Sequence, residues 1–386
     1  MPVARNGALE QIMRPEPRSS AQVLRAPIGA PAHRRRNSRE NMDHRDVIVI
    51  GASAGGIETL QQLVKSLPAG FPASVFVTVH FPETGSSVLP RILTRAGALA
   101  AVHATDGESI VHERIYVARP DFHLLPGPDG IRCVRGPREN GNRPAIDPMF
   151  RSAAVSFGPR VIAVVLSGNL DDGTSGAAAV KRNGGIVVAQ DPDDALFPSM
   201  PQSVIDHVQV DYIVPIRLLG RTLCELVAQP LIESAKTPES DDVMEKKYSE
   251  ADLGAIEQPD AHPGKLSSFG CPDCGGVLWE INDGDFVRFR CRVGHAWTTD
   301  ALLEKQSDSF DDALWTALRA LEESAALSRQ IAQRHRMRGA TSVADRFDAQ
   351  AESAEARAVV IRSSLLRARG PRETRDSEET PAVRAS

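Results

Sequence analysis

The stretch that decides the fold is VIVIGASAGGIETLQQLV, residues 47–64. A short apolar run rich in β-branched residues ends in the glycine-rich corner GASAGG, and an amphipathic segment follows at once. This order predicts a buried strand, a tight corner and a helix. Ser53 lies in the middle of the corner, which raises the question of whether the glycines bind a phosphate or the serine acts as a nucleophile.

The same alternation of apolar runs and amphipathic segments continues from Asp46 to about Val227. The strand candidates are VIVIG, SVFVTVHF, RIYVA, VIAVVLSG, GGIVVAQ and DYIVPI, and the helical stretches include IETLQQLVKSL, SSVLPRILTRAG, MFRSAAVSFG and GAAAVKRNG. Strands that are apolar almost throughout, separated by helices, indicate a mostly parallel sheet covered on both faces. The sequence therefore predicts a doubly wound α/β domain, in which reacting groups collect beyond the carboxyl ends of the strands.

Composition and charge narrow the class of protein. The chain has 386 residues, of which 41% are hydrophobic and 25% charged, and its formal net charge is −5. No apolar run approaches the roughly 20 residues of a membrane helix, and an acidic balance gives no reason to expect a nucleic-acid partner. Five cysteines in this length argue against a secreted disulfide framework and for a reducing compartment. We therefore expect a cytoplasmic protein without a membrane span.

Shifts in composition divide the chain into segments. The first 45 residues carry 9 Arg against 4 acidic residues and lack hydrophobic periodicity, so we expect them to be disordered. Two alternatives stay open for them, a transit peptide and a translation start at Met42. The segments expected after them are an α/β domain (46–228), a linker rich in Pro, Ser and acids (229–268), a small cysteine-bearing module (269–300), a helical hairpin (301–369) and a disordered tail (370–386).

The hairpin is predicted from apolar residues at helical spacing. The first stripe is Phe310, Leu314, Ala317, Leu321 and Ala325, and the second is Val343, Phe347, Ala351 and Ala354. Gly339 separates them, so we expect two antiparallel helices. Such helices could also mediate self-association.

The glycine corner does not match the common phosphate loops. A dinucleotide fingerprint requires glycine where Ser53 stands, and a Walker loop requires Lys after the last glycine, where this chain has Ile57 and Glu58. The stretch does match G-x-S-x-G at a strand-to-helix corner, where a helix amino terminus can stabilise an oxyanion. Whether Ser53 is a nucleophile or the N-cap of the helix stays open on this pattern alone.

Candidate partners for Ser53 follow two other strands. His80 comes directly after SVFVTV, and Asp171 and Asp172 come just past the apolar run VIAVVL. Each alone has a structural reading, a partly buried histidine and a turn or helix cap. Together they place a serine, a histidine and a carboxylate at one edge of a parallel sheet, which is the set that serine hydrolysis needs.

At these residues the chain resembles the catalytic domain of the chemotaxis protein-glutamate methylesterases, the CheB family, over about residues 46–225. The motifs that carry the resemblance are VIVIGASAGG, VHFP, YVARPDFHLLPGPDG, IDPMFRSAA, VVLSGNLDDG and AQDPDDALFPSMPQSVI. It implies hydrolysis of glutamyl methyl esters on chemoreceptors with release of methanol, possible deamidation of glutamine, and no cofactor for catalysis. It also implies Ser53 as nucleophile, His80 as base, Asp172 as orienting carboxylate, and a methylated chemoreceptor or related signalling protein as partner.

The resemblance has departures. The family's aspartate motif usually reads T-G-M-G-x-D-G, whereas Asn169 and Leu170 replace Met and Gly here, beside the expected oxyanion site. Ala54 stands where many members have threonine. The first 45 residues are too few for the amino-terminal receiver domain of the best-known members, so we expect any regulation to lie elsewhere. An alternative function is a catalytically weakened scaffold that binds a signalling partner through the cysteine-bearing module and the hairpin.

The cysteines of that module have metal-ligand spacing. Cys271, Cys274, Cys291 and His295 form C-x2-C-x16-C-x3-H, which predicts a tetrahedral structural zinc site in a zinc-ribbon-like module. Four protein ligands leave no open position for catalysis. The alternative is four unpaired side chains in a loop. Neighbouring acidic residues offset the arginines of the module, so we expect no nucleic-acid binding.

Overall fold

The computed structural model describes residues 44–81, 87–231, 242–243, 245–247, 264–283 and 286–368. Contacts divide the chain into residues 1–41 and residues 42–386, and the described residues all belong to the second unit. The predicted disordered ends, 1–45 and 370–386, lie outside the described residues apart from His44 and Arg45. None of the helices in the described ranges is both long enough and apolar enough to cross a membrane.

Seven strands form one parallel sheet in the order β3-β4-β2-β1-β7-β8-β9. They are β1 (Val47–Ala52), β2 (Ser74–Val79), β3 (Ala100–His103), β4 (Arg114–Val117), β7 (Val161–Val165), β8 (Ile186–Gln190) and β9 (Tyr212–Val214). The strand order reverses at β1, which pairs with β2 on one side and with β7 on the other. The carboxyl ends of these three strands therefore lie next to one another at the point where α/β folds usually place their ligands.

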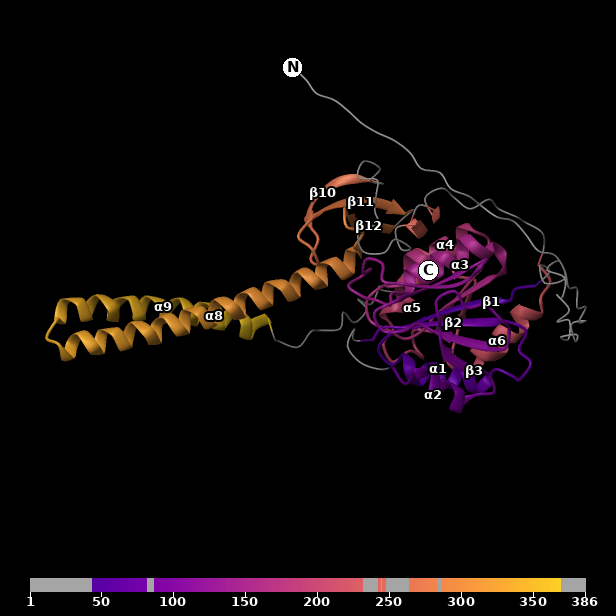
Figure 1. The fold of residues 1–386 in the computed structure, drawn as a ribbon, viewed down its shortest axis with the longest axis horizontal. Coiled ribbons are helices and arrows are strands. Elements are labelled where there is room, and N and C mark those ends of the chain that lie inside the picture. The colour runs from indigo at the N-terminus through magenta and orange to yellow at the C-terminus, as the bar shows by residue number, and fades with distance from the viewer. Residues whose placement is uncertain are drawn as a thin grey trace, which may run out of the picture. The chain divides into compact units, whose positions relative to one another are not determined.

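Two helical layers cover the sheet (Figure 1). One layer contains α1 (Gly56–Ser66), α2 (Leu89–Ala96) and α6 (Ile216–Ala228), and the other contains α3 (Ile146–Phe157), α4 (Thr174–Arg182) and α5 (Ser199–His207). Successive residues of β1 alternate between the two cores, since Ile48 and Ile50 pack with the first layer and Val47 and Val49 with the second. The predicted doubly wound α/β fold is confirmed.

Several elements of this domain were not predicted. They are β3, the antiparallel hairpin of β5 (His123–Gly127) and β6 (Gly130–Val134), and the helices α5 and α6. Strand β3 is short and begins with two alanines, so it has little β-propensity of its own. Prolines stand inside β5 and near the start of α5, where they obscure the periodic pattern. Apolar residues before and after Pro215 run together in the sequence, which hid the boundary between β9 and α6.

A second, antiparallel sheet forms the small module that carries the cysteines. Its order is β10-β11-β12-β13, with β10 (Lys265–Gly270), β11 (Val277–Asp283), β12 (Phe286–Cys291) and β13 (Ala296–Thr298). Buried residues of this sheet and of the helix after it make one small core, Cys271, Leu278, Phe289, Cys291, Trp297, Ala301 and Leu302. We call residues 264–298 the Cys/His module.

The helices α8 (Thr299–Met337) and α9 (Thr341–Ala368) form the predicted antiparallel hairpin. Ion pairs join Arg329 to Glu355, Arg336 to Asp348 and Glu322 to Arg362 in antiparallel register. The interhelical seam includes Leu318, which the predicted stripe omitted, whereas Phe310 is 63% exposed and its placement in the stripe was wrong.

The predicted linker, residues 229–268, includes short described pieces that contact other parts of the protein. Residues 242–243 and 245–247 are helical. Asp242 accepts a hydrogen bond from Arg182 of α4 over 2.6 Å, and Glu245 accepts from Arg288 of β12 over 2.9 Å. These contacts tie the pieces to helix α4 of the α/β domain and to strand β12 of the second sheet. The predicted segment boundaries themselves stay predictions.

Candidate active site

The structure brings together the three side chains that the sequence singled out. Ser53 follows β1 directly and His80 follows β2 directly, and because Ala52 pairs with Val79 the two residues stand side by side. Asp172 lies in the loop between β7 and α4. Ser53 Oγ lies 3.1 Å from His80 Nδ1, and His80 Nε2 lies 2.7 Å from Asp172 Oδ2. The predicted set therefore forms a continuous hydrogen-bonded chain from hydroxyl to carboxylate.

The carboxylate determines which nitrogen of His80 carries the proton. Asp172 can only accept, so the Nε2–H of His80 donates to it, and the lone pair of Nδ1 faces the hydroxyl of Ser53. The His80 side chain is 14% exposed and that of Asp172 is 2% exposed. The His80 side chain is thus partly accessible, whereas the Asp172 end of these hydrogen bonds is buried.

Asp172 is held by more than His80. Its Oδ2 also accepts from the amide of Ile146 over 2.8 Å, and its Oδ1 accepts from the amide of Asp147 and from Asn140 Nδ2, each over 3.2 Å. The two amides belong to the first turn of α3, where unpaired N–H groups favour an anion. Burial alone would raise the pKa of Asp172, but the hydrogen bonds from His80 and from these amides outweigh it and hold the pKa below its usual value. The group is therefore a stable carboxylate.

Asn140 and Asp147 are parts of this site that sequence reasoning missed. Asp147 is buried, and its Oδ1 accepts from the amides of Gly173 and Gly176 over 3.0 and 2.7 Å, at the start of α4. Burial and the nearby charge of Asp172 raise the pKa of Asp147 well above its usual value. An Asp-Pro pair at the start of a helical stretch was the available signal, but it did not show which element would lie against that helix end.

Ser53 is not the helix cap that the alternative reading required. The N-cap of α1 is Gly55, in the left-handed region with φ 70°, and no side chain caps that helix end. The backbone around Ser53 is close-packed, since its N–H donates to Ser167 O over 3.0 Å. A Cβ added to Gly168 would lie 2.8 Å from Ser53 Cβ and 2.1 Å from Met200 Sδ. Glycine at position 168 therefore lets the aspartate loop, residues 167–173, approach the corner.

Asn169 and Leu170, the two residues of the aspartate loop that depart from the family motif, lie in different surroundings. Asn169 is exposed. Leu170 has φ 61°, a left-handed conformation that is rare for a branched side chain, and it packs against the core of the Cys/His module. Asp171 is buried, and its Oδ1 accepts from Thr298 Oγ1 over 2.7 Å. Burial raises the pKa of Asp171 to about 7, and the Thr298 hydrogen bond opposes that rise.

His123, which lies in the motif YVARPDFHLLPGPDG, makes no hydrogen bond to Ser53, His80 or Asp172. Its side chain is fully buried. Its Nε2–H donates to Pro137 O over 2.8 Å, and its Nδ1 accepts from the amide of Ala145 over 3.3 Å. Burial lowers the pKa of His123, so the ring is a neutral structural link.

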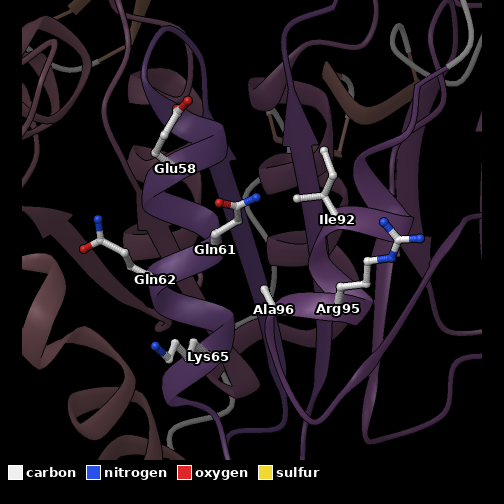
Figure 2. Close-up of a pocket in the computed structure, with 7 residues that line it drawn as sticks. All are labelled: Glu58, Gln61, Gln62, Lys65, Ile92, Arg95 and Ala96. Atoms are coloured by element: carbon white, nitrogen blue, oxygen red, sulfur yellow. The ribbon is translucent and has the colours of Figure 1, made fainter.

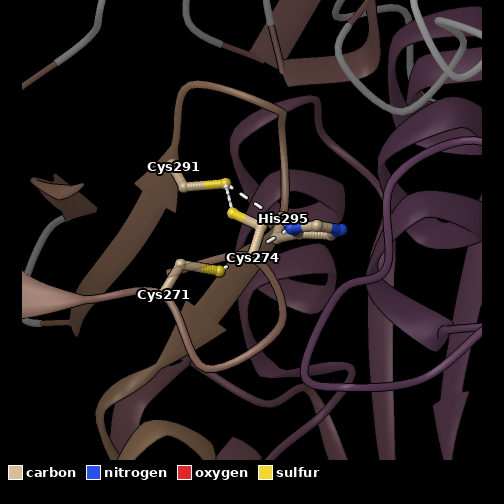
Figure 3. Close-up of side chains that lie close together, drawn as sticks. All are labelled: Cys271, Cys274, Cys291 and His295. Carbon is tan, nitrogen blue, oxygen red and sulfur yellow. Dashed lines mark hydrogen bonds between the residues drawn. The ribbon is translucent and has the colours of Figure 1, made fainter. Parts of the chain in front are cut away.

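The predicted ligand set of the module also comes together (Figure 3). One ligand atom from each of Cys271, Cys274, Cys291 and His295 lies within 4.8 Å of the others. Cys274 Sγ and Cys291 Sγ are 3.6 Å apart, too far for a disulfide, and His295 Nδ1 lies 3.6 Å from Cys271 Sγ and from Cys291 Sγ. Ligands on a tetrahedron with bonds of about 2.3 Å are separated by roughly 3.8 Å. The four side chains therefore fit a tetrahedral metal ion.

A hollow of about 550 Å³ lies elsewhere on the α/β domain, between α1 and α2 (Figure 2). Its lining residues are Glu58, Gln61, Gln62, Lys65, Ile92, Arg95 and Ala96. None of Ser53, His80 and Asp172 is among them. The chemistry of the three side chains thus belongs to the strand ends and not to this hollow.

Over the α/β domain, the chain is similar to proteins of one known family. A model of the family described as CheB methylesterase matches residues 48–223. A putative protein-glutamate methylesterase/protein-glutamine glutaminase of Leptospira interrogans is 33% identical over 182 residues, which are 47% of this chain and 94% of that protein. A protein-glutamate methylesterase/protein-glutamine glutaminase of Methanosarcina mazei is 32% identical over 205 residues, 50% of this chain and 56% of the relative.

A solved structure is similar as well. The Thermotoga maritima CheB methylesterase catalytic domain is 34% identical, with a TM-score of 0.46, over 47% of this chain and 98% of that structure. This chain spans about half the length of several of its curated relatives. The family match ends at residue 223, so the Cys/His module and the helical hairpin lie beyond it.

Proposed function

Because the chain belongs to the CheB methylesterase family, we propose that it is a protein-glutamate methylesterase that hydrolyses glutamyl methyl esters on a methylated chemoreceptor or a related signalling protein. The observation that carries the proposal is the chain of hydrogen bonds from Ser53 through His80 to Asp172. We expect the same site to deamidate glutamine side chains, an activity that the names of the relatives also include.

The proposed reaction begins with attack of Ser53 Oγ on the ester carbonyl. His80 Nδ1 takes the hydroxyl proton as the new C–O bond forms, and Asp172 stabilises the resulting imidazolium through Nε2–H. The start of α1, three residues after Ser53, directs backbone dipoles toward the developing oxyanion. No cofactor is needed for these steps.

Collapse of the tetrahedral intermediate breaks the bond to methoxide, which leaves as methanol with the proton from His80. Water then attacks the acyl-enzyme while His80 removes one of its protons. His80 then returns this proton to Ser53 Oγ as the bond between Oγ and the acyl carbon breaks, which leaves a glutamate carboxylate and free Ser53. With a glutamine substrate the leaving group is ammonia, and the same proton transfers apply.

The Cys/His module supports a second, structural proposal. Three thiolates and one imidazole are the ligands that Zn²⁺ favours, and their spacing matches a closed tetrahedral site. Zinc there would hold together a module whose own core is small. Reduced cysteines of this kind are in keeping with a cytoplasmic protein, and the α8–α9 hairpin is the element that we would test for self-association.

A serine-reactive fluorophosphonate and a methylated receptor peptide test the function together. We expect labelling and methanol release from the unaltered chain, and loss of both in Ser53→Ala. Ser309→Ala is the control, because this serine is exposed on α8 and bonds only within its own helix. Absence of both activities in the unaltered chain would favour the scaffold alternative instead.

A further inference from the structure

A short segment of the α/β domain pairs with the Cys/His module beside the active site. The amide of Asn140 donates to Ala296 O over 2.8 Å, and the amide of Ala296 donates to Arg138 O over 3.1 Å. Glu139 and Ala296 form an isolated parallel bridge. The segment 138–140 is therefore held alongside β13 in the manner of an additional strand.

The side chain of Asn140 connects the module to the catalytic carboxylate. Its Oδ1 accepts from the amide of Thr298 over 2.9 Å, and its Nδ2 donates to Asp172 Oδ1 over 3.2 Å and to Asp147 Oδ2 over 3.4 Å. The reverse orientation of the amide would place its oxygen against two carboxyl groups, so the hydrogen bonds define its direction. Asn140 is 8% exposed, which removes competing water.

The aspartate loop meets the module at two further residues. Leu170 packs against the module core that contains Trp297, and Asp171 accepts from Thr298 Oγ1 over 2.7 Å. Three successive residues, 170, 171 and 172, thus touch the module or are joined to it through Asn140. A leucine in the left-handed conformation, where the family usually has glycine, is understandable if its side chain is needed as an anchor in the module.

Buried ion pairs also hold the segment 138–140 in place. Glu139 accepts from Arg151 of α3 and, over 3.4 Å, from Arg290 of the module, and all three side chains are buried. Burial alone would raise the pKa of Glu139, but the two guanidinium groups outweigh it and lower the pKa. The neighbour of Asn140 is therefore a charged link between α3 and β12.

From these contacts we propose that the Cys/His module acts as a clamp on the aspartate side of the catalytic site, with Asn140, Leu170 and Thr298 as positioning residues. The inference rests on the proposed hydrolase function. Loss of the metal-binding geometry would loosen Thr298, then Asn140 and the aspartate loop, so that Asp172 no longer holds His80 in place. The module then controls the turnover rate of the catalytic site, although the module itself contacts no substrate.

Hydrogen–deuterium exchange on the full chain tests the structural half of the clamp without relying on activity. Zinc-loaded protein is compared with protein treated with a zinc chelator and with Cys274→Ser. We expect faster exchange of the amides of Ile146, Asp147 and Gly173 in the two metal-free samples, and unchanged exchange in β8. Unchanged exchange at all three amides would overturn the clamp.

Kinetics of single variants test the catalytic half. Asn140→Ala and Leu170→Gly should each lower kcat for a methyl ester by roughly 10- to 100-fold, with KM changed by less than about twofold. Thr298→Val should lower kcat and Thr298→Ser should restore it, because only the hydroxyl reaches Asp171. Thr299→Val is the control, since the Thr299 hydroxyl bonds Val287 O instead.

The outcomes separate the clamp from the function on which it rests. If the unaltered chain hydrolyses the ester and the Asn140 and Leu170 variants match its kcat, the clamp is wrong and the hydrolase stands. If the unaltered chain shows no hydrolysis, the proposed function fails, and the exchange experiment still decides whether the module holds the loop. A variant that fails to fold is replaced by chelation of the unaltered chain, with the same expected fall in kcat.

Discussion

His80 Nε2 lies 2.7 Å from Asp172 Oδ2, although 92 positions separate the two residues in the chain. Both follow strands that pair with β1, so the sheet brings them to one edge. Three further donors hold the Asp172 carboxylate in place independently of His80. The relationship therefore gives a preorganised acceptor for the imidazolium that forms during the reaction.

The two neighbouring aspartates should differ sharply in their effect on turnover. Asp172→Asn replaces a charged acceptor by a neutral amide whose NH2 group can only donate, so the proton is no longer fixed on His80 Nε2 and we expect kcat for ester hydrolysis to fall by roughly 10³- to 10⁴-fold. Asp171→Asn keeps an oxygen for the Thr298 hydroxyl and should lower kcat by less than about tenfold. Steady-state assays with a methyl ester measure both. A larger loss in Asp171→Asn than in Asp172→Asn would reverse the assignment.

The proximity of Ser53 and His80 was predictable from the sequence because each follows an apolar strand directly. The geometry of a parallel sheet then requires their proximity. The support of Asp172 was not predictable, since Asn140 lies outside the strands and helices and Thr298 lies more than a hundred residues further along. Only tertiary contacts place the end of β13 against Asn140.

The Cys/His module likewise has features that were predictable from the sequence and features that were not. The spacing from Cys271 to His295 was enough to predict the ligand set, because metal ligation imposes local geometry. Leu170 looked like a departure that weakened the catalytic loop. Its contact with the module core, which explains a leucine at that position, could not be read from either segment alone.

Gly168 should tolerate no side chain. A Cβ there would lie 2.1 Å from Met200 Sδ and 2.8 Å from Ser53 Cβ, so Gly168→Ala must push the aspartate loop away from the nucleophile. We expect kcat to fall at least tenfold and the free energy of unfolding to fall by about 1–3 kcal/mol. Gly270→Ala is the control, since its nearest neighbour is 4.0 Å away. Kinetics and denaturant unfolding measure the two effects, and wild-type values for Gly168→Ala would contradict the contact.

Metal binding should depend on each of the four ligands. Cys274→Ser leaves three of the four, so we expect the ratio of zinc to protein after gel filtration to fall from about one to below about a tenth. Cys224→Ser on α6 should leave the ratio unchanged, because that thiol lies outside the cluster. Elemental analysis of the two variants provides the measurement. Equal zinc content in both would rule out the Cys/His module as the metal site.

Asp171 should make the protein less stable as the pH rises from about 4 to about 7. Burial raises its pKa from the ordinary 3.8 to about 7, so between these values the folded state binds a proton that the unfolded state has released. The stabilisation is complete below the lower value and is lost as the pH passes the higher one. Asp171→Asn removes this titration while keeping an acceptor for Thr298 Oγ1.

The free energy of unfolding of the unaltered chain, relative to that of Asp171→Asn, should therefore decline across this range by up to about 4 kcal/mol. Chemical denaturation at several pH values measures the difference, in which the titration of other groups largely cancels. Asp206→Asn, an exposed position on α5, serves as the matched control for the loss of one carboxylate. A difference that is flat with pH, or that grows in favour of the unaltered chain, would mean that Asp171 is ionised in the folded protein and that Thr298 donates to a carboxylate there.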